Sequence, residues 1–128
     1  MAILFHCPWD NADQWLAALQ SALPNDEFRI WPDVGDPGEI DFAMVWRIPL
    51  GALAGFPKLL AISSLGAGVD ALIADPELPR NIPIARLIDP LMADRMAEYV
   101  CATVLHYHLG LDRYDGQQAR KHWQRHPT

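Results

Sequence analysis

The chain has 128 residues, of which 51% are hydrophobic and 20% charged, a composition typical of one globular domain with a substantial core and not of a disordered segment. Its net charge of −6 argues against a nucleic-acid binder and against a protein that binds anionic membranes. The two cysteines show no paired framework, no apolar run reaches membrane-spanning length, and no basic region leads into a signal core, which together favour a reduced, cytoplasmic protein.

The first two thirds of the chain predict strands and helices in alternation. A strand over residues 2–7 comes first, and Asp10 or Asn11 can cap the helix that follows over residues 12–23. Four more strands and two short helices follow, with Pro76 limiting the last helix to about two turns: strands 28–31, 42–46, 59–65 and 84–87, and helices 50–55 and 69–73. This alternation predicts an α/β fold with a parallel sheet of about five strands and right-handed crossovers.

A glycine loop joins the fourth predicted strand to the short helix after it. Gly66 and Gly68 flank Ala67, and their missing Cβ atoms permit positive φ angles and a close approach of another molecule to the backbone. The free N–H groups of the loop and the positive end of a helix beginning near Val69 would together form a seat for an anion. The alternative is a tight strand-to-helix turn that binds no ligand.

The same loop partly matches a dinucleotide fingerprint. Gly66, Gly68 and Ala71 fit the pattern G-x-G-x-x-G/A, and Asp89 follows a predicted strand at a plausible distance. That fingerprint normally follows the first strand of its unit, whereas three predicted strands precede this loop, and Pro76 makes the helix short. A small anion such as a carboxylate therefore suits the loop better than a pyrophosphate.

The last third of the chain predicts one long helix over residues 93–111, capped by Asp89 or near Asp94. Its apolar side chains form two stripes, one of Met92, Met96, Val100, Thr103, Tyr107 and Leu111, and another of Ala97, Cys101, Leu105 and Leu109. A helix that covers only its own sheet needs one apolar stripe, so we expect the second to pack against something outside this chain. A more polar helix over residues 112–125 then leads to Thr128, where the chain looks cut.

Histidines occur in two arrangements that could carry chemistry. His122 and His126 share a helix face, but no carboxylate or cysteine lies close enough in sequence to complete a metal site, so we interpret them as part of a solvated basic face. His6 and Cys7 end the first strand, where adjacent side chains point to opposite faces, so we interpret both as structural. The sequence thus predicts no metal site.

Several motifs together carry a resemblance to a known family. They are Met44-Val45-Trp46, Leu65-Gly66-Ala67-Gly68-Val69-Asp70, Arg86-Leu87-Ile88-Asp89-Pro90-Leu91-Met92 and Met96-Ala97-Glu98-Tyr99-Val100, continued by Tyr114, Gln118 and Trp123. In this combination the chain resembles the N-terminal part of the D-isomer-specific 2-hydroxyacid dehydrogenases, and within them the glyoxylate/hydroxypyruvate reductase A branch. The resemblance covers essentially the whole chain.

The resemblance implies a two-domain oxidoreductase. Residues 1–91 would be a flavodoxin-like substrate domain, and residues 92–128 an interdomain helix with the start of a linker towards a missing Rossmann domain. That missing domain would hold NADP(H) or NAD(H) and supply the catalytic Arg, Glu and His. No catalytic residue is therefore expected in this chain, which should be inactive alone, and the enzyme is expected to be a homodimer.

The resemblance also implies which residues of this chain form the site. Backbone amides would hold the carboxylate of a small 2-oxoacid or 2-hydroxyacid substrate, namely those of Leu65, Gly66, Ala67 and Gly68. Trp46 would line the substrate pocket, and Met92 and Met96 would lie near the nicotinamide. The glycine loop is then a carboxylate seat and not the dinucleotide loop.

Two functions stay open at this point. The chain could be the substrate-binding domain of an NAD(P)H-dependent glyoxylate or hydroxypyruvate reductase. It could instead be a stand-alone module that binds small acids or other proteins and self-associates through its C-terminal helix. A strand followed by G-x-G-x-x-G after Thr128 would favour the enzyme, and a natural stop there would favour the module.

Overall fold

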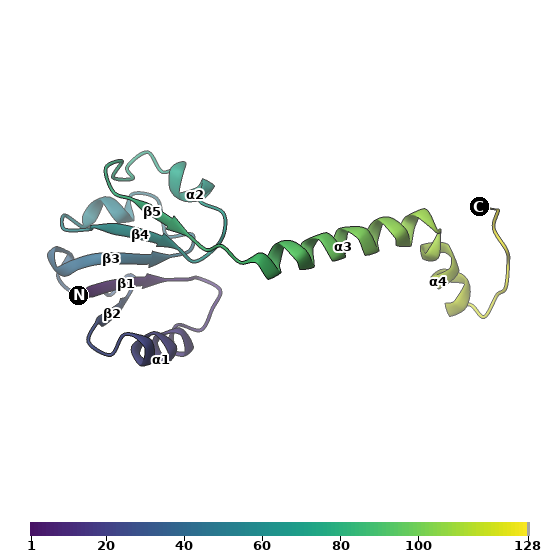
Figure 1. Ribbon diagram of the computed structural model, residues 1–128, viewed down its shortest axis with the longest axis horizontal. Coiled ribbons are helices and arrows are strands. Elements are labelled where there is room, and N and C mark those ends of the chain that lie inside the picture. Colours follow the sequence, from purple (N-terminus) through teal and green to yellow (C-terminus); the bar gives the residue numbers. More distant parts are fainter. Residues whose placement is uncertain (128) are drawn as a thin grey trace. The chain divides into compact units, whose positions relative to one another are not determined.

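A five-stranded parallel sheet forms the centre of the first structural unit. The computed structural model describes residues 1–127, and its strands lie in the order β2-β1-β3-β4-β5, each parallel to its neighbours (Figure 1). They are β1 (Ala2–His6), β2 (Glu27–Ile30), β3 (Ile40–Val45), β4 (Ala61–Ser64) and β5 (Ile84–Arg86). This strand order is the flavodoxin-like one, so the predicted fold class is confirmed.

Strand β1 is buried because its apolar side chains alternate between two covered faces of the sheet. Phe5 points to the face that carries helix α1 (Ala12–Ala22), where its ring lies 5.6 Å from that of Trp15. Leu4 points to the opposite face and belongs to the main apolar cluster, with Val34, Ile40, Ala43, Val45, Ile48, Leu53, Phe56, Leu59, Ile62, Leu72 and Leu78. Burial on both faces is what parallel sheets require.

Helix α1 begins at the predicted cap. The Asn11 Oδ1 atom accepts the backbone N–H groups of Asp13 at 2.9 Å and Gln14 at 3.3 Å, which satisfies two of the unpaired donors of the first turn. Of the two candidate caps, Asn11 is therefore the one used. The Asp10 carboxylate instead accepts the indole N–H of Trp15 at 3.0 Å, which connects the residue before the cap to the apolar side of the helix.

The segments between β3 and β5 are shorter than predicted. A 3-10 helix, η2 (Ala52–Gly55), replaces one expected helix, and α2 (Asp70–Ile73) has a single turn where about two were expected. The buried carboxylate of Asp75 accepts the N–H groups of Gly51 and Glu77, each at 2.9 Å. These bonds hold the backbone after α2 in a turn, so the helix cannot continue.

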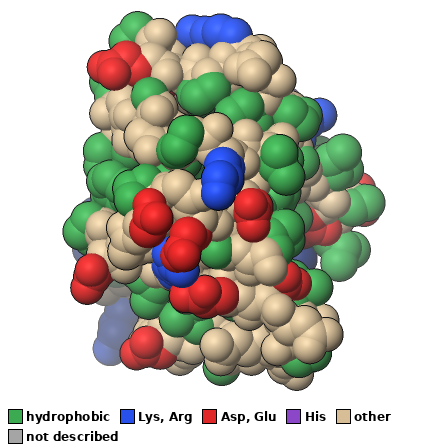
Figure 2. All heavy atoms as spheres, turned by 90° about the vertical axis from the view of Figure 1, so that its left-hand side faces the viewer, with side chains coloured by type: hydrophobic (Ala, Val, Ile, Leu, Met, Phe, Trp, Pro, Cys, Tyr) green, Lys and Arg blue, Asp and Glu red, His purple; other side chains and the backbone are tan. Residues whose placement is uncertain are grey.

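Charged side chains gather where the strands begin, and acidic ones predominate on this side of the molecule (Figure 2). Arg29 in β2 donates to carboxylates of Glu27 at 2.8 Å and Glu39 at 2.6 Å, and to the carbonyl of Val34 at 3.0 Å. It thereby holds the loop before β3, which contains the 3-10 helix η1 (Pro37–Glu39). The hydrogen bond from the Arg29 guanidinium lowers the pKa of the Glu27 carboxyl.

The chain divides into two compact units, Met1–Ile88 and Asp89–Thr128. The second unit consists of α3 (Pro90–His108) and α4 (Leu111–Ala119), followed by non-helical chain. This structural division follows residue 88. The functional division after residue 91 stays a prediction.

Helix α3 starts and ends earlier than predicted. Asp89 caps it as expected, accepting the N–H of Leu91 at 3.0 Å, but the helix begins at once with Pro90 and not at residue 93. Proline fits the first helical position because its missing N–H would have no partner there. The helix ends at His108, not residue 111, because Gly110 adopts a left-handed φ of +65°.

Helix α4 is also shorter than expected. It ends at Ala119, whereas the sequence predicted helix as far as residue 125. Lys121 has a left-handed φ of +52°, a backbone conformation that a helix cannot contain. Trp123, expected on a helix, therefore lies in non-helical chain and is 86% exposed.

No residue of α3 is buried. Its apolar side chains are solvent-exposed on several sides of the helix, namely Leu91, Met92, Met96, Tyr99, Val100, Val104, Leu105 and Tyr107. One stripe was expected to pack on the chain's own sheet, and no residue of α3 is buried in the described part of the chain; the partner expected for the second stripe, outside this chain, stays a prediction. None of the helices described is both long and apolar enough to cross a membrane.

Candidate functional site

A cavity of about 250 Å³ opens beyond the carboxyl ends of β3 and β4. It is lined by Val45, Trp46, Arg47, Ser64, Gly68, Asp70, Ala71 and Leu72. In open parallel α/β sheets, ligands bind beyond the carboxyl ends of the strands, because loops converge there over a rigid frame. Two of the predicted site residues, Trp46 and Gly68, line this cavity.

The carbonyl groups of the glycine loop are held by hydrogen bonds from the protein. The carbonyl of Gly66 accepts the N–H of Leu87 at 3.2 Å, and that of Ala67 accepts a guanidinium N–H of Arg86 at 3.3 Å. The carbonyl of Gly68 accepts the hydroxyl of Ser64 at 3.0 Å. Three consecutive acceptors are thus satisfied, and the backbone cannot rotate without losing them.

The N–H groups of the same loop fall into two pairs. Leu65 donates to the carbonyl of Val45 at 3.0 Å and Gly66 to the Ser64 hydroxyl at 3.3 Å, so both are occupied. The N–H groups of Ala67 and Gly68 have no acceptor among residues 1–127. Two adjacent backbone donors without an internal acceptor are available to bind an anion. Of the four predicted amides, these two have the required freedom.

Neither loop glycine uses the positive φ that glycine permits. Gly66 is needed for a steric reason instead, because a Cβ atom there would overlap the ring of Trp46. A Cβ atom at Gly68 would meet nothing closer than the Asp70 carboxylate at 3.7 Å, an ordinary contact. Gly66 therefore lets an aromatic side chain lie flat against the loop, which is a different role from the one predicted.

The helix end contributes less to anion binding than predicted. Helix α2 has four residues, too few for the dipole of a longer helix to build up. Its first residue is Asp70, whose carboxylate lies beside Gly68 and disfavours a highly charged group there. The free amides, not the helix, are the anion-binding feature. The same two facts argue against a pyrophosphate here, so this loop does not fit a dinucleotide.

Trp46 and Arg47 line the cavity, and Trp9 contacts both of them without lining it. The indole of Trp9 lies edge-on to that of Trp46, with ring centroids 6.5 Å apart. The Arg47 guanidinium lies over the Trp9 ring, its central carbon 5.2 Å from the ring centroid, which is a cation–π geometry. Arg47 also has a left-handed φ of +47°, a strained conformation for a non-glycine residue. Sequence reasoning missed Trp9 and Arg47, whose signal was their position just after predicted strands.

Ser64 is a second residue that sequence reasoning missed. Its buried hydroxyl accepts from Gly66 and donates to Gly68, so one side chain spans the loop. A serine at the end of a buried strand, directly before a glycine loop, is the available signal, because its hydroxyl can bond backbone two to four residues further on.

The pair predicted to be structural lies at the end of β1. Burial lowers the pKa of the His6 imidazole below its usual range. The thiol of Cys7 lies 3.5 Å from the Asp10 carboxylate. No hydrogen bond joins His6 to Cys7 in the described part of the chain, and Cys7 and Cys101 are free thiols.

The second unit holds the remaining predicted site residues. Met92 and Met96 are exposed on α3 and line a shallow cavity of about 450 Å³ with Asp89, Leu91, Arg95 and Tyr99. Their expected place near a nicotinamide stays a prediction.

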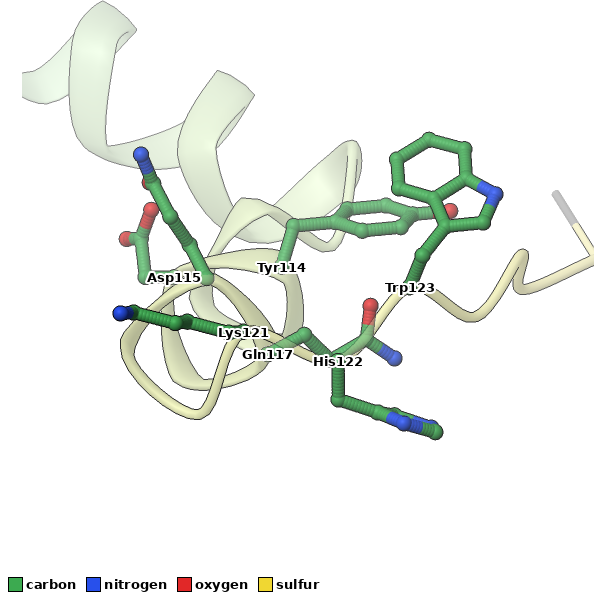
Figure 3. Close-up of a pocket in the computed structure, with 7 residues that line it drawn as sticks. Tyr114, Asp115, Gln117, Lys121, His122 and Trp123 are labelled. Atoms are coloured by element: carbon green, nitrogen blue, oxygen red, sulfur yellow. The ribbon is translucent and has the colours of Figure 1, made fainter.

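A larger cavity, of about 550 Å³, lies against α4 and the chain that follows it. It is lined by Tyr114, Asp115, Gln117, Gln118, Lys121, His122 and Trp123, and Figure 3 shows the Trp123 and Tyr114 rings along one side of it. Its wall offers no adjacent pair of free backbone donors on a tied loop. Size alone therefore does not make it the candidate site.

The histidines near the C-terminus make contacts within this unit. The Nε2 atom of His126 lies 2.6 Å from the side-chain nitrogen of Gln117, and its backbone N–H donates to the Tyr114 hydroxyl at 3.2 Å. Residues 1–127 contain no group of three or more side chains placed to bind a metal ion.

No protein-family model matches the chain. Among curated proteins, it is 43% identical over 129 residues to the glyoxylate/hydroxypyruvate reductase A of Yersinia enterocolitica, a match that covers 97% of this chain and 41% of the relative. Among solved structures, it is similar to a D-isomer-specific 2-hydroxyacid dehydrogenase from Xanthobacter autotrophicus in complex with NADPH and MES. That match has a TM-score of 0.80 and 38% identity, and covers 99% of this chain and 42% of the other. The resemblance to the D-isomer-specific 2-hydroxyacid dehydrogenases is confirmed.

The chain is also similar to a second solved structure, whose name states its activity. It is an NADPH-dependent glyoxylate/hydroxypyruvate reductase from Sinorhizobium meliloti in complex with NADP and sulfate, with a TM-score of 0.80 and 26% identity over 99% of this chain. The chain spans about two fifths of the length of these dehydrogenases, since the coverage is 41% and 42%. The fold of this chain is thus similar to part of two oxidoreductases whose structures contain NADP or NADPH.

Proposed function

We propose that this chain is the substrate-binding part of an NAD(P)H-dependent reductase of glyoxylate or hydroxypyruvate. The observation that carries the proposal is the hydrogen bonding of the glycine loop. Its carbonyls accept hydrogen bonds from the protein, whereas the N–H groups of Ala67 and Gly68 have no acceptor in the described residues. Gly68 and Trp46 line the cavity. A carboxylate placed there would accept two hydrogen bonds from a backbone that is already ordered, so binding would cost little conformational entropy.

Each predicted site residue has a role in this proposal. The amides of Ala67 and Gly68 bind the substrate carboxylate, while Leu65 and Gly66 use their own amides to hold the loop in place. Trp46 closes one side of the pocket and excludes water from the keto group. The chemistry supplied by the nicotinamide is hydride transfer to the keto carbon.

The rest of the reductase would lie in a Rossmann domain outside these 128 residues. That domain would hold NADP(H) or NAD(H) and provide the catalytic Arg, Glu and His, with Met92 and Met96 facing the nicotinamide from α3. We expect the enzyme to be cytoplasmic, since free thiols at Cys7 and Cys101 suit a reducing compartment. We also expect it to be a homodimer.

The test is a titration of the 128-residue chain followed by NMR of its backbone amides. Glyoxylate and its reduced product glycolate should shift the Ala67 and Gly68 resonances, whereas acetamide, which is uncharged and of similar size, should not. NADPH should show no measurable affinity in calorimetry, and the chain alone should show no reductase activity. Micromolar NADPH binding, or acid-induced shifts that avoid the loop, would contradict the proposal.

A second candidate function is a stand-alone module that self-associates through α3. The exposed apolar side chains of that helix favour it, because such a surface in water promotes pairing. Sedimentation decides whether the chain pairs at all, and small-acid binding decides whether a module of this kind also recognises a substrate. A clean monomer at high protein concentration would eliminate this candidate.

A further inference from the structure

Arg47 lines the cavity and has no negatively charged partner among the described residues. No described carboxylate forms an ion pair with its guanidinium, which lies instead over the Trp9 ring. By contrast, Arg29 has two carboxylate partners, and Arg86 donates to the carbonyl of Ala67. Arg47 combines three features: it lines the cavity, no described carboxylate pairs with it, and its guanidinium lies over an aromatic ring.

The backbone of Arg47 adds an independent observation. Its φ of +47° lies in the left-handed region, which costs a non-glycine residue free energy that the surrounding structure must supply. The N–H of neighbouring Trp46 donates to the His6 carbonyl at 2.7 Å, which fixes the backbone directly before Arg47. The protein therefore holds Arg47 in an unfavourable conformation next to the cavity, and such strain concentrates at functional sites.

The position of the guanidinium separates it from the carboxylate seat. Contacts run from Gly66 to the ring of Trp46, from Trp46 to Trp9, and from Trp9 to Arg47. The guanidinium thus lies against the ring of Trp9 and not against the glycine loop. The cavity, at about 250 Å³, is several times larger than the roughly 30 Å³ that one water molecule takes up in the liquid, so it has room for an acid longer than glyoxylate.

We propose that Arg47 binds a second acidic group of the substrate, so that this site takes 2-oxo and 2-hydroxy acids that carry two carboxylates. The inference rests on the proposed function: one carboxylate occupies the amides of Ala67 and Gly68, and the other pairs with the guanidinium. The carboxylate of Asp70 also lines the cavity and opposes a dianion, and the charge of Arg47 offsets it. Trp9 orients the guanidinium without neutralising it.

The experiment compares two acids that differ by one carboxylate. D-lactate and D-malate are titrated into the 128-residue chain at constant ionic strength, and dissociation constants are taken from the Ala67 and Gly68 amide shifts. D-malate should bind about tenfold more tightly than D-lactate, because a guanidinium–carboxylate pair adds a charge-assisted hydrogen bond. Arg47→Gln should weaken D-malate binding about tenfold more than D-lactate binding, which removes this preference, and Arg47→Lys should keep part of it. Arg125→Gln, which removes the same charge in the second unit, should change neither acid.

Each other outcome overturns the inference in a distinguishable way. Equal affinities of the unaltered chain for both acids would refute a second carboxylate site while leaving the proposed function standing. If Arg47→Gln lowers the affinity for both acids equally, Arg47 binds the carboxylate that D-lactate and D-malate have in common. If neither acid shifts the two amides, the inference and the proposed function both fail.

Discussion

The ring of Trp46 occupies the space that a side chain on Gly66 would need. This relationship links the end of β3 to the loop after β4, so the position of the Trp46 ring in the cavity depends on the residue at position 66. It also separates the two glycines of the loop, since Gly68 has no such neighbour.

Gly66→Ala should therefore destabilise the fold, whereas Gly68→Ala should not. The added methyl at residue 66 must displace the Trp46 ring or the loop, and overpacking of this kind costs about 1–3 kcal/mol. The methyl at residue 68 should stay within about 0.5 kcal/mol, as at ordinary surface positions. Urea unfolding of both variants measures the difference, and carboxylate-induced amide shifts should weaken in Gly66→Ala. Equal stabilities would show that the ring moves aside freely.

Ser64→Ala should loosen the loop. The variant loses the hydroxyl that accepts from Gly66 and donates to Gly68, and each such hydrogen bond contributes about 0.5–1.5 kcal/mol. Ser63→Ala is the matched control, because no side-chain hydrogen bond involves that neighbouring serine in the described residues. Chemical denaturation should separate the two variants by about 1 kcal/mol or more, and a similar loss in both would contradict the bridging role of Ser64.

Stability should decrease in mildly acidic solution because of His6. Burial holds the pKa of this imidazole below its ordinary value of 6.5, so protons bind the unfolded chain more readily than the folded one. The contribution of His6 is complete above pH 6.5 and is lost as the pH falls through the lowered folded-state pKa. Urea midpoints measured across this window should decline less steeply in His6→Gln. An unchanged slope would mean that other groups cause the decline.

Glu27 should act in the same direction at lower pH. Its pKa is lowered by the hydrogen bond from Arg29, so the ion pair stabilises the fold above the ordinary carboxyl pKa of 4.5 and is lost as the pH falls through the lowered value. Glu27→Gln should flatten the acid part of the stability profile. Because this pair is solvent-exposed, salt should weaken the effect, and Glu98→Gln on α3 provides a carboxylate control outside the sheet.

The apolar surface of α3 should make the chain self-associate. Val100 and Val104 are 50% and 60% exposed, one turn apart on the same side of the helix. Val100→Glu and Val104→Glu together should shift sedimentation towards the monomer, whereas Asp94→Asn and Glu98→Gln should not. Identical profiles for all variants would place the association elsewhere.

Signals confined to one stretch of sequence were enough to predict most of the fold. The apolar runs of β1, β3 and β4 were identified, and each cap was narrowed to two candidates that included Asn11 and Asp89, because short-range patterning decides them. The ends of α2 and α4 were not, since the first depends on Asp75 bonding a distant loop and the second on a left-handed Lys121. Both are set by contacts or strain that local propensity does not encode.

The candidate site was predictable in its location but not in its mechanism of binding. The loop from Leu65 to Gly68 could be found from its glycines and its place after a strand. Which of its N–H groups are free could not, because the acceptors that occupy the other two are the carbonyl of Val45 and the hydroxyl of Ser64. The Arg47–Trp9 contact likewise joins two strand ends that are far apart in sequence.

The unequal use of the loop's amides has a consequence for deuterium uptake. The hydrogens of Leu65 and Gly66 are retained by internal acceptors, while those of Ala67 and Gly68 are open to replacement by solvent deuterons. Occupancy of the seat would slow isotope exchange at two neighbouring positions and leave the preceding two almost unchanged. Deuterium uptake at these two amides thus reports a bound acid without any enzymatic turnover.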